Sequence, residues 1–114
     1  MAEHSVMSAL MDVIAERKAR PQAEKSYVAG LMNGGVAKIG AKIVEEAAEV
    51  VEAGAEPGEA GAEHLVREVA DLVFHAMVLL GFRDLKWHQV EDELARRFGI
   101  SGIDEKAARG RGRE

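Results

Sequence analysis

The sequence contains no cysteine and no threonine, and only 4% of its 114 residues are aromatic. Without cysteine the chain forms no disulfide, binds no zinc through thiolates and has no thiol nucleophile. No apolar run reaches the roughly 18 residues that a membrane-spanning helix needs, and the first residues lack the apolar core of a signal peptide. We therefore expect a cytoplasmic protein with no membrane partner.

Positive charge is also in the minority. Fifteen lysines and arginines stand against 20 acidic residues, which gives a net charge of −5. Such a chain is not drawn electrostatically to a nucleic-acid backbone, so we expect no nucleic-acid partner. Hydrophobic residues make up 47% of the chain and few of them are aromatic, which favours an aliphatic, helical core. The length fits one domain, expected over residues 1–109, with residues 110–114 as a disordered tail.

Apolar residues recur at helical spacing between glycine and proline breaks, and no strand–helix–strand pattern occurs. Ser26 is a suitable helix cap, while Gly34-Gly35, the stretch around Pro57 and Gly99 indicate interruptions. The sequence predicts an all-α bundle of about five helices, with one further helical turn within residues 100–114 before the disordered end. The helices are expected over residues 5–20, 26–33, 36–53, 63–80 and 86–98.

Residues 72–80 (LVFHAMVLL) are apolar on nearly every side of a helix, and such a helix is buried on two faces. A chain of this length can hardly cover both faces by itself. We therefore predict a homodimer whose interface includes Phe74, Val78 and their neighbours.

The segment VEEAAEVVEA, residues 44–53, carries four glutamates that differ in direction on a helix. When Val36, Ile39, Ile43, Ala47, Val50 and Gly54 form the core stripe, Glu45 and Glu52 point outward. Glu46 and Glu49 then lie on the flank of the core, on the same side as Lys38 and Lys42. A groove between two helices is expected at that flank.

The next long helix repeats this arrangement. With Leu65, Val69, Val73, Ala76 and Leu80 as its core stripe, Glu68, Asp71 and His75 lie on one flank. Carboxylates three residues apart are neighbours on a helix, and two such pairs can converge on one point. Oxygen donors of this kind suit Mg²⁺, with Mn²⁺ as a substitute, and a carboxylate-held Mg²⁺ commonly binds substrate phosphates. From the residues alone, a solvated acidic face and a metal site both stay open, and His75 is more typical of a hydrogen-bonded core histidine.

Glu46-x-x-Glu49 followed 19 residues later by Glu68-x-x-Asp71 resembles the ExxE…ExxD signature of the all-α MazG-like nucleoside-triphosphate pyrophosphatases. Within that group the chain resembles the phosphoribosyl-ATP pyrophosphohydrolases over about residues 6–109. The segments that carry this resemblance are SYVAGLMNGGVAKIGAKIVEEAAEVV, EVADLVFHAMVLL and SGIDEKAAR. Val28, Ile43-Val44 and Phe74 depart from the family's usual residues, and none of them is a candidate ligand.

This resemblance implies a homodimeric, Mg²⁺-dependent enzyme that hydrolyses N1-(5-phosphoribosyl)-ATP to the AMP compound and pyrophosphate, the second step of histidine biosynthesis. Expected metal ligands are Glu46, Glu49, Glu68 and Asp71, and Glu46 and Glu49 are the catalytic candidates because a carboxylate there can take a proton from the attacking water. Lys38 and Lys42 are expected to bind the triphosphate. By resemblance more than by geometry, Arg17, Lys106 and Arg109 are expected to bind the distal phosphate.

Three other functions compete with this one. A house-cleaning pyrophosphatase acting on another (deoxy)nucleoside triphosphate would share the acidic signature but gives no reason for the SGIDEKAAR segment. A diiron carboxylate oxidase requires Glu-x-x-His pairs on its helices, and none occurs in this sequence. A non-catalytic helical dimerisation module explains the aliphatic helices but not the acidic flanks.

Overall fold

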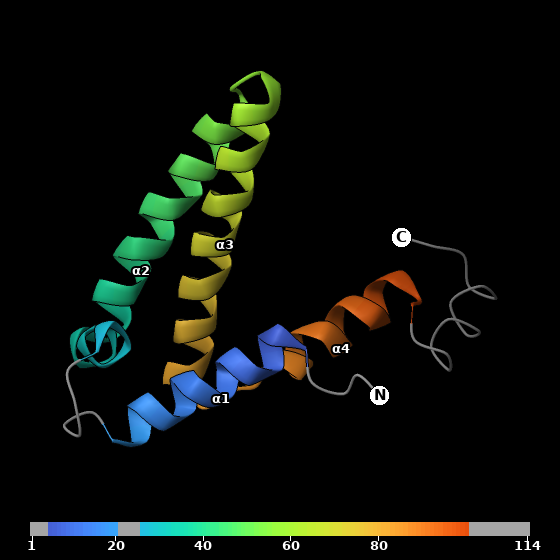
Figure 1. Cartoon of the computed structure of the whole chain (residues 1–114). Coiled ribbons are helices and arrows are strands. Elements are labelled where there is room, and N and C mark those ends of the chain that lie inside the picture. Colours follow the sequence, from blue (N-terminus) through green and yellow to red (C-terminus); the bar gives the residue numbers. More distant parts are fainter. Residues whose placement is uncertain (1–4, 21–25, 101–114) are drawn as a thin grey trace.

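The computed structural model describes residues 5–20 and 26–100. Within these residues the chain forms four helices and no strand: α1 (Val6–Ala19), α2 (Tyr27–Gly54), α3 (Gly58–Phe82) and α4 (Trp87–Phe98). Helices α2 and α3 form a long antiparallel hairpin, α1 crosses the base of that hairpin, and α4 extends to one side of it (Figure 1). The predicted all-α fold class is confirmed. No helix of the described segments has the length and apolarity to cross a membrane.

Local chemistry sets the helix ends. The side chains of Ser5 and Ser26 accept hydrogen bonds from the backbone N–H groups of Ser8 and Ala29, at 3.2 and 3.0 Å, and so cap α1 and α2. Helix α4 ends at Gly99, which adopts the left-handed conformation with φ 62° and ψ 38°. The predicted cap at Ser26 and the predicted stop at Gly99 are both confirmed.

The predicted break at Gly34-Gly35 is present as a kink inside α2. Gly35 has φ 70° and ψ −163°, a backbone conformation that is essentially restricted to glycine. Two segments predicted as separate helices, residues 26–33 and 36–53, are therefore joined in one kinked helix. This joining lowers the helix count from about five to four over the described segments, and the helical turn predicted in the tail lies outside them.

The prediction that α3 begins at residue 63 is wrong, because the helix already starts at Gly58. Pro57 occupies the cap position, where its missing N–H is not needed by the helix. A Cβ at Gly61 would lie 2.3 Å from the carbonyl oxygen of Glu56, so the hairpin turn closes only when this position is glycine. Residues 58–63 thus belong to the helix, and the interruption around Pro57 is confined to residues 55–57.

Helices α2 and α3 face each other through residues spaced at intervals of seven. The buried positions of α2 after the kink are Ile39, Glu46 and Ala53, and those of α3 include Gly61 and His75. Glu68 lies midway between these two α3 positions, and its side chain is 13% exposed. Seven-residue spacing is the period of a coiled-coil seam. The middle pair of this antiparallel seam is therefore acidic.

This seam differs from the predicted core stripes. Val36 and Val69, which the helical wheels assigned to the core, are 55% and 40% exposed, whereas His75, Met77 and Val78 are buried. The predicted stripes follow the broader apolar face of each helix, and much of that face is open in a single chain. Val78 is fully buried in the chain's own core, so its predicted place at a dimer interface is wrong.

The hydrophobic core lies where α1 packs across the base of the hairpin. It consists of residues from three helices: Met11 and Ile14 of α1, Val28, Leu31 and Ile39 of α2, and Met77 and Val78 of α3. Gly81 lets α1 come close, because a Cβ there would lie 2.6 Å from Cγ2 of Ile14. The core anchors the lower ends of both hairpin helices, and the acidic pair lies above it.

Candidate metal centre

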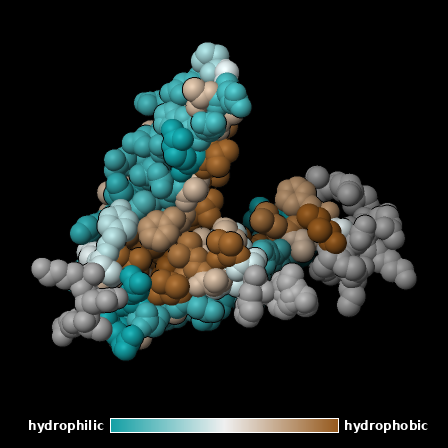
Figure 2. All heavy atoms as spheres, viewed as in Figure 1, coloured by the Kyte–Doolittle hydropathy of each residue, from teal (hydrophilic) through white to brown (hydrophobic). Residues whose placement is uncertain are grey.

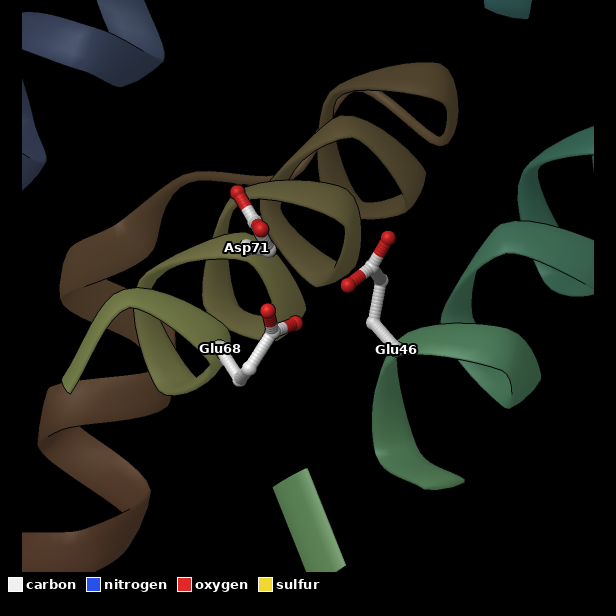
Figure 3. Close-up of side chains that lie close together, drawn as sticks. All are labelled: Glu46, Glu68 and Asp71. Carbon is white, nitrogen blue, oxygen red and sulfur yellow. The ribbon is translucent and has the colours of Figure 1, made fainter. Parts of the chain in front are cut away.

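Three carboxylates meet in the middle of the seam. Glu46 of α2 and Glu68 and Asp71 of α3 each place one oxygen so that these atoms lie within 4.8 Å of one another. Figure 3 shows the three side chains converging from the two helices. The i, i+3 spacing puts Glu68 and Asp71 on one side of α3, and the antiparallel register brings Glu46 opposite them. The structure thus brings together three of the four predicted metal ligands.

The donors in this group suit a hard cation. Glu46 is 7% exposed, and one oxygen of Glu46 and one of Glu68, the Oε1 atom of each, are buried without a hydrogen-bond partner among the described residues. A buried carboxylate oxygen without a partner is costly unless a cation meets it. Oxygen-only donors match the preference of Mg²⁺ and Mn²⁺. The residues present therefore fit a divalent metal ion.

Glu49, the fourth predicted ligand, lies next to this group rather than within it. A hydrogen bond to Glu68, together with the negative charge of Glu68, raises the pKa of the Glu49 carboxyl above its ordinary value of 4.5. The Glu49 carboxyl therefore holds its proton more tightly than an isolated glutamate would. Glu45 and Glu52 are both exposed, as the helical wheel predicted.

Lys42 supplies positive charge at the edge of the cluster. Its ammonium group donates a hydrogen bond to Oε1 of Glu45 at 3.2 Å and lies 3.7 Å from Oε2 of Glu46. The hydrogen bond to Glu45 raises the pKa of Lys42 above 10.5. Lys38 is placed differently, because its Nζ lies 3.4 Å from the carbonyl oxygen of Gly30, on the other side of the kink. Of the two predicted triphosphate lysines, Lys42 is the one paired with the acidic cluster.

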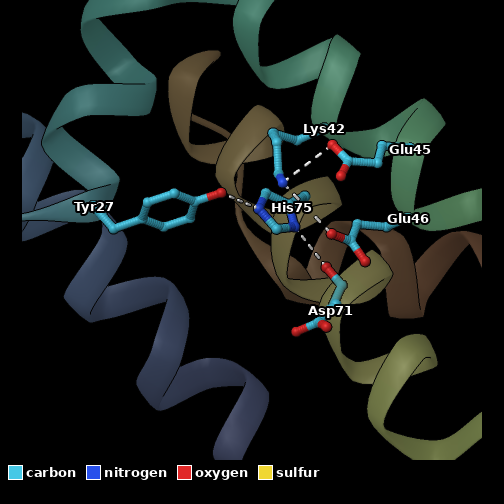
Figure 4. A network of polar contacts seen from close by, with 6 residues as sticks. All are labelled: Tyr27, Lys42, Glu45, Glu46, Asp71 and His75. Atoms are coloured by element: carbon cyan, nitrogen blue, oxygen red, sulfur yellow. Dashed lines mark hydrogen bonds and ion pairs between the residues drawn. The ribbon is translucent and has the colours of Figure 1, made fainter. Parts of the chain in front are cut away.

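His75 is the buried, hydrogen-bonded histidine that its position suggested, with 4% exposure. Its Nδ1 lies 2.8 Å from the backbone carbonyl oxygen of Asp71, which can only accept a hydrogen bond, so Nδ1 carries the proton. Nε2 then accepts a hydrogen bond from the Tyr27 hydroxyl at 2.7 Å (Figure 4). Tyr27 precedes the kink of α2, so this bond joins the first segment of α2 to α3 beside the three carboxylates.

His64 has a role that its sequence position did not suggest. Its Nδ1 lies 2.9 Å from Oε1 of Glu56 and its Nε2 lies 3.2 Å from Oε2 of Glu68. The hydrogen bond to Glu56 is the main cause that raises the pKa of this imidazole above 6.5. The i, i+4 spacing of His64 and Glu68 was visible in the sequence, but the approach of Glu56 depends on the tight hairpin turn.

The predicted distal-phosphate residues are only partly covered by the structure. Arg17 lies in the last turn of α1, where its Nε is 3.7 Å from a carboxylate oxygen of Glu16. Lys106 and Arg109 lie outside the described residues, as does the tail predicted for residues 110–114. The proposed roles of these residues stay predictions.

Known proteins resemble this chain over nearly its whole length. A sequence model of the family described as phosphoribosyl-ATP pyrophosphohydrolase matches residues 7–98. The chain belongs to this family. A relative from Neisseria meningitidis serogroup C, named phosphoribosyl-ATP pyrophosphatase, is 51% identical over 105 residues, which cover 92% of this chain and 94% of the relative.

Two other relatives are also named phosphoribosyl-ATP pyrophosphatase. The protein from Geotalea daltonii is 50% identical over 93% of this chain and 96% of its own length. The protein from Rhodopirellula baltica is 48% identical over 88% of this chain and 82% of its own length. The family membership that the ExxE…ExxD spacing and the accompanying segments predicted is confirmed, and the matched region contains the whole acidic cluster.

Proposed function

We propose that this chain hydrolyses N1-(5-phosphoribosyl)-ATP to N1-(5-phosphoribosyl)-AMP and pyrophosphate, the second step of histidine biosynthesis. The observation that carries the proposal is the convergence of Glu46, Glu68 and Asp71 within 4.8 Å, with two buried carboxylate oxygens unpartnered, in a chain of this family. Relatives about 50% identical to it are named phosphoribosyl-ATP pyrophosphatase. The substrate is assigned from that likeness and the metal from the acidic cluster.

The proposed ligands of a Mg²⁺ ion, with Mn²⁺ as a substitute, are Glu46, Glu68 and Asp71, with Glu49 beside them. When bound, the ion would supply charge neutralisation at the phosphates and activation of water. Glu46 would contribute a carboxylate oxygen from α2, and Glu68 and Asp71 would each contribute one from α3, so both hairpin helices are needed. Because the four carboxylates repel one another, a cation is the group that the site accommodates best.

Proton transfer is assigned to Glu49. A general base works best when its pKa lies closer to the working pH, and the interaction with Glu68 raises the pKa of Glu49 in that direction. Glu46 is more buried and lies in the three-carboxylate group, so it serves as a ligand. Lys42 is close enough to the cluster to exchange its contacts with Glu45 and Glu46 for the oxygens of a bound triphosphate.

Turnover of the purified chain tests this function. With Mg²⁺ and phosphoribosyl-ATP we expect stoichiometric release of pyrophosphate, and removal of the metal with EDTA should abolish it. ATP and the deoxynucleoside triphosphates, assayed at the same concentration, should be poor substrates. Comparable cleavage of a deoxynucleotide would support the house-cleaning alternative, and no cleavage of any nucleotide would support the dimerisation module.

The same proposal includes a homodimer, for which the open apolar faces give the physical reason. A groove of about 360 Å³ on the hairpin is lined by Val36, Ile43, Ala76, Leu79 and Leu80, together with Arg83 and Leu85. Figure 2 shows apolar residues continuing from the hairpin toward α4. On α4 and just before it, Leu85, Leu94 and Phe98 are 38%, 44% and 55% exposed. A second copy of the chain is the proposed cover for this surface.

The proposed cellular location of the enzyme, and the proposal that it has no nucleic-acid or membrane partner, are based on the sequence alone. A cytoplasmic enzyme without nucleic-acid or membrane partners is the prediction that follows from its composition and acidic charge.

A further inference from the structure

His64 connects the hairpin turn to the acidic cluster. Its Nδ1 lies 2.9 Å from Oε1 of Glu56, in the turn between α2 and α3, and its Nε2 lies 3.2 Å from Oε2 of Glu68. A carboxylate oxygen only accepts hydrogen bonds, so Nδ1 donates to Glu56, and Nε2 lies at ion-pair distance from Glu68. The imidazole therefore bridges two carboxylates that belong to different parts of the hairpin.

The two oxygens of Glu68 have different environments. Oε2 faces His64, whereas Oε1 is buried and has no hydrogen-bond partner among the described residues. Glu68 also belongs to the three-carboxylate group with Glu46 and Asp71. A glutamate side chain has three rotatable bonds, and repulsion from the other carboxylates favours rotamers that turn it away from the cluster. A contact that holds one of its oxygens opposes that rotation.

We propose that His64 is a positioning residue, which holds Glu68 by one oxygen, anchored through Glu56, so that the other oxygen is available to the metal ion. The inference rests on the proposed metal-dependent function, because Glu68 matters here as a metal ligand. Partner groups that hold a ligand in this way typically change metal affinity 10- to 100-fold when they are removed.

A second effect of His64 has the opposite sign. A positive imidazole near the site repels the metal ion, so its removal would strengthen binding. Its side chain is 32% exposed, however, and one partly exposed charge changes binding by about fivefold at most. The positioning effect is therefore expected to dominate. Two substitutions separate the effects: His64→Ala removes both the contact and the charge, whereas His64→Gln removes the charge but keeps an N–H donor four residues before Glu68.

The experiment measures Mn²⁺ binding to the full chain by calorimetry, at one fixed pH and with no nucleotide. We expect His64→Ala to bind Mn²⁺ about 10- to 100-fold more weakly than the wild type, and His64→Gln to stay within about fivefold of it. His88→Ala is the matched control, because Nδ1 of His88 makes a similar i, i+4 contact of 3.4 Å with Asp92, on α4. It should bind Mn²⁺ as the wild type does.

Activity provides a second readout. For His64→Ala, the Mg²⁺ concentration that gives half-maximal pyrophosphate release should rise by the same factor, while kcat at saturating Mg²⁺ stays close to the wild-type value. A loss of kcat that saturating Mg²⁺ does not restore would place His64 in the reaction itself and overturn the positioning role.

Three other results would also overturn the inference. Tighter Mn²⁺ binding by both His64 variants would show that only the charge matters. A lower Tm of metal-free His64→Ala with unchanged Mn²⁺ affinity would show that His64 only holds the hairpin turn. If the wild type itself binds no Mn²⁺, both the proposed metal function and this inference fail, whereas wild-type binding with an unaffected His64→Ala removes the inference alone.

Discussion

Replacing Glu46 with glutamine should make the metal-free protein more stable while it abolishes the response to metal. Glu46 is 7% exposed, and its cluster oxygen lies within 4.8 Å of those of Glu68 and Asp71. Two like charges at that distance repel by about 3 kcal/mol at an effective dielectric constant of about 20. Glutamine has almost the same shape, removes one of the charges and can donate an N–H to a neighbouring carboxylate.

The net gain is smaller than this repulsion, because Glu46 also has a favourable contact. Lys42 lies 3.7 Å from its Oε2 atom, and a partly exposed pair of this kind is worth about 0.2–1 kcal/mol. Solvent screening reduces the repulsion further. We therefore expect Glu46→Gln to stabilise the metal-free protein by about 1 kcal/mol, which corresponds to a rise in Tm of about 4 °C for a domain of this size.

In the presence of the metal ion, the wild type should be more stable than Glu46→Gln. An ion present at 100 times its Kd stabilises the wild type by about 2.7 kcal/mol, whereas Glu46→Gln, which lacks one ligand charge, should show little shift. Thermal melts in EDTA and in excess Mg²⁺ measure both effects. Glu45→Gln is the matched control, because this neighbouring carboxylate is exposed and also contacts Lys42, but lies outside the three-carboxylate group. A lower metal-free Tm for Glu46→Gln than for the wild type, or a Mg²⁺-induced Tm shift in Glu46→Gln as large as that of the wild type, would refute the reasoning.

Three further predictions concern protonation, the kink and assembly. Because folding raises the pKa of Glu49 above 4.5, protonated Glu49 stabilises the metal-free protein at low pH, and this stabilisation is lost as the pH rises through the raised pKa. Over the same pH range, the affinity for Mn²⁺ measured by calorimetry should increase as the carboxyl loses its proton. An Mn²⁺ affinity that does not change over this range would contradict the prediction. Gly35→Ala should lower the free energy of unfolding in urea by about 1–3 kcal/mol, because Gly35 has a φ of 70°. Gly40→Ala should raise the free energy of unfolding by about 0.5–1 kcal/mol, because a Cβ at Gly40 would meet nothing within 4 Å. Leu94→Lys should convert the proposed dimer to a monomer in sedimentation experiments without loss of helicity. Val44→Lys, at a side chain that is 71% exposed, should leave the proposed dimer intact. A wild-type protein that sediments as a monomer would refute the homodimer.

Several features of the fold followed from local chemistry in the sequence. The cap at Ser26 depends on one side chain and a backbone N–H three residues away. The stop at Gly99 and the kink at Gly35 depend on conformations that favour glycine. Such features involve neighbouring residues, so they can be predicted without knowledge of the tertiary structure.

The choice of buried face was not predictable in the same way. Val36 and Val69 belong to apolar stripes as regular as any core, yet they are 55% and 40% exposed. Hydrophobic periodicity shows that a face is buried, but not whether the chain itself or another molecule covers it. The seam through Ile39 and Glu46 was harder to recognise, because one of its central members is charged. His64 was missed because its anchor, Glu56, comes close only when the turn at Gly61 closes.

The acidic cluster lies in the seam between α2 and α3, above the apolar core at the base of the hairpin. The hairpin is held at its base by apolar contacts, including those of Ile39 and Met77, so the upper seam can contain Glu46 and Glu68 without loss of the fold. A seam filled with apolar side chains at those two positions would be more stable, because buried carboxylates are costly without a cation. The chain has acidic residues at the middle pair of seam positions instead. The proposed metal binding would therefore be coupled to hairpin stability, since an ion held by Glu46, Glu68 and Asp71 would also join α2 to α3.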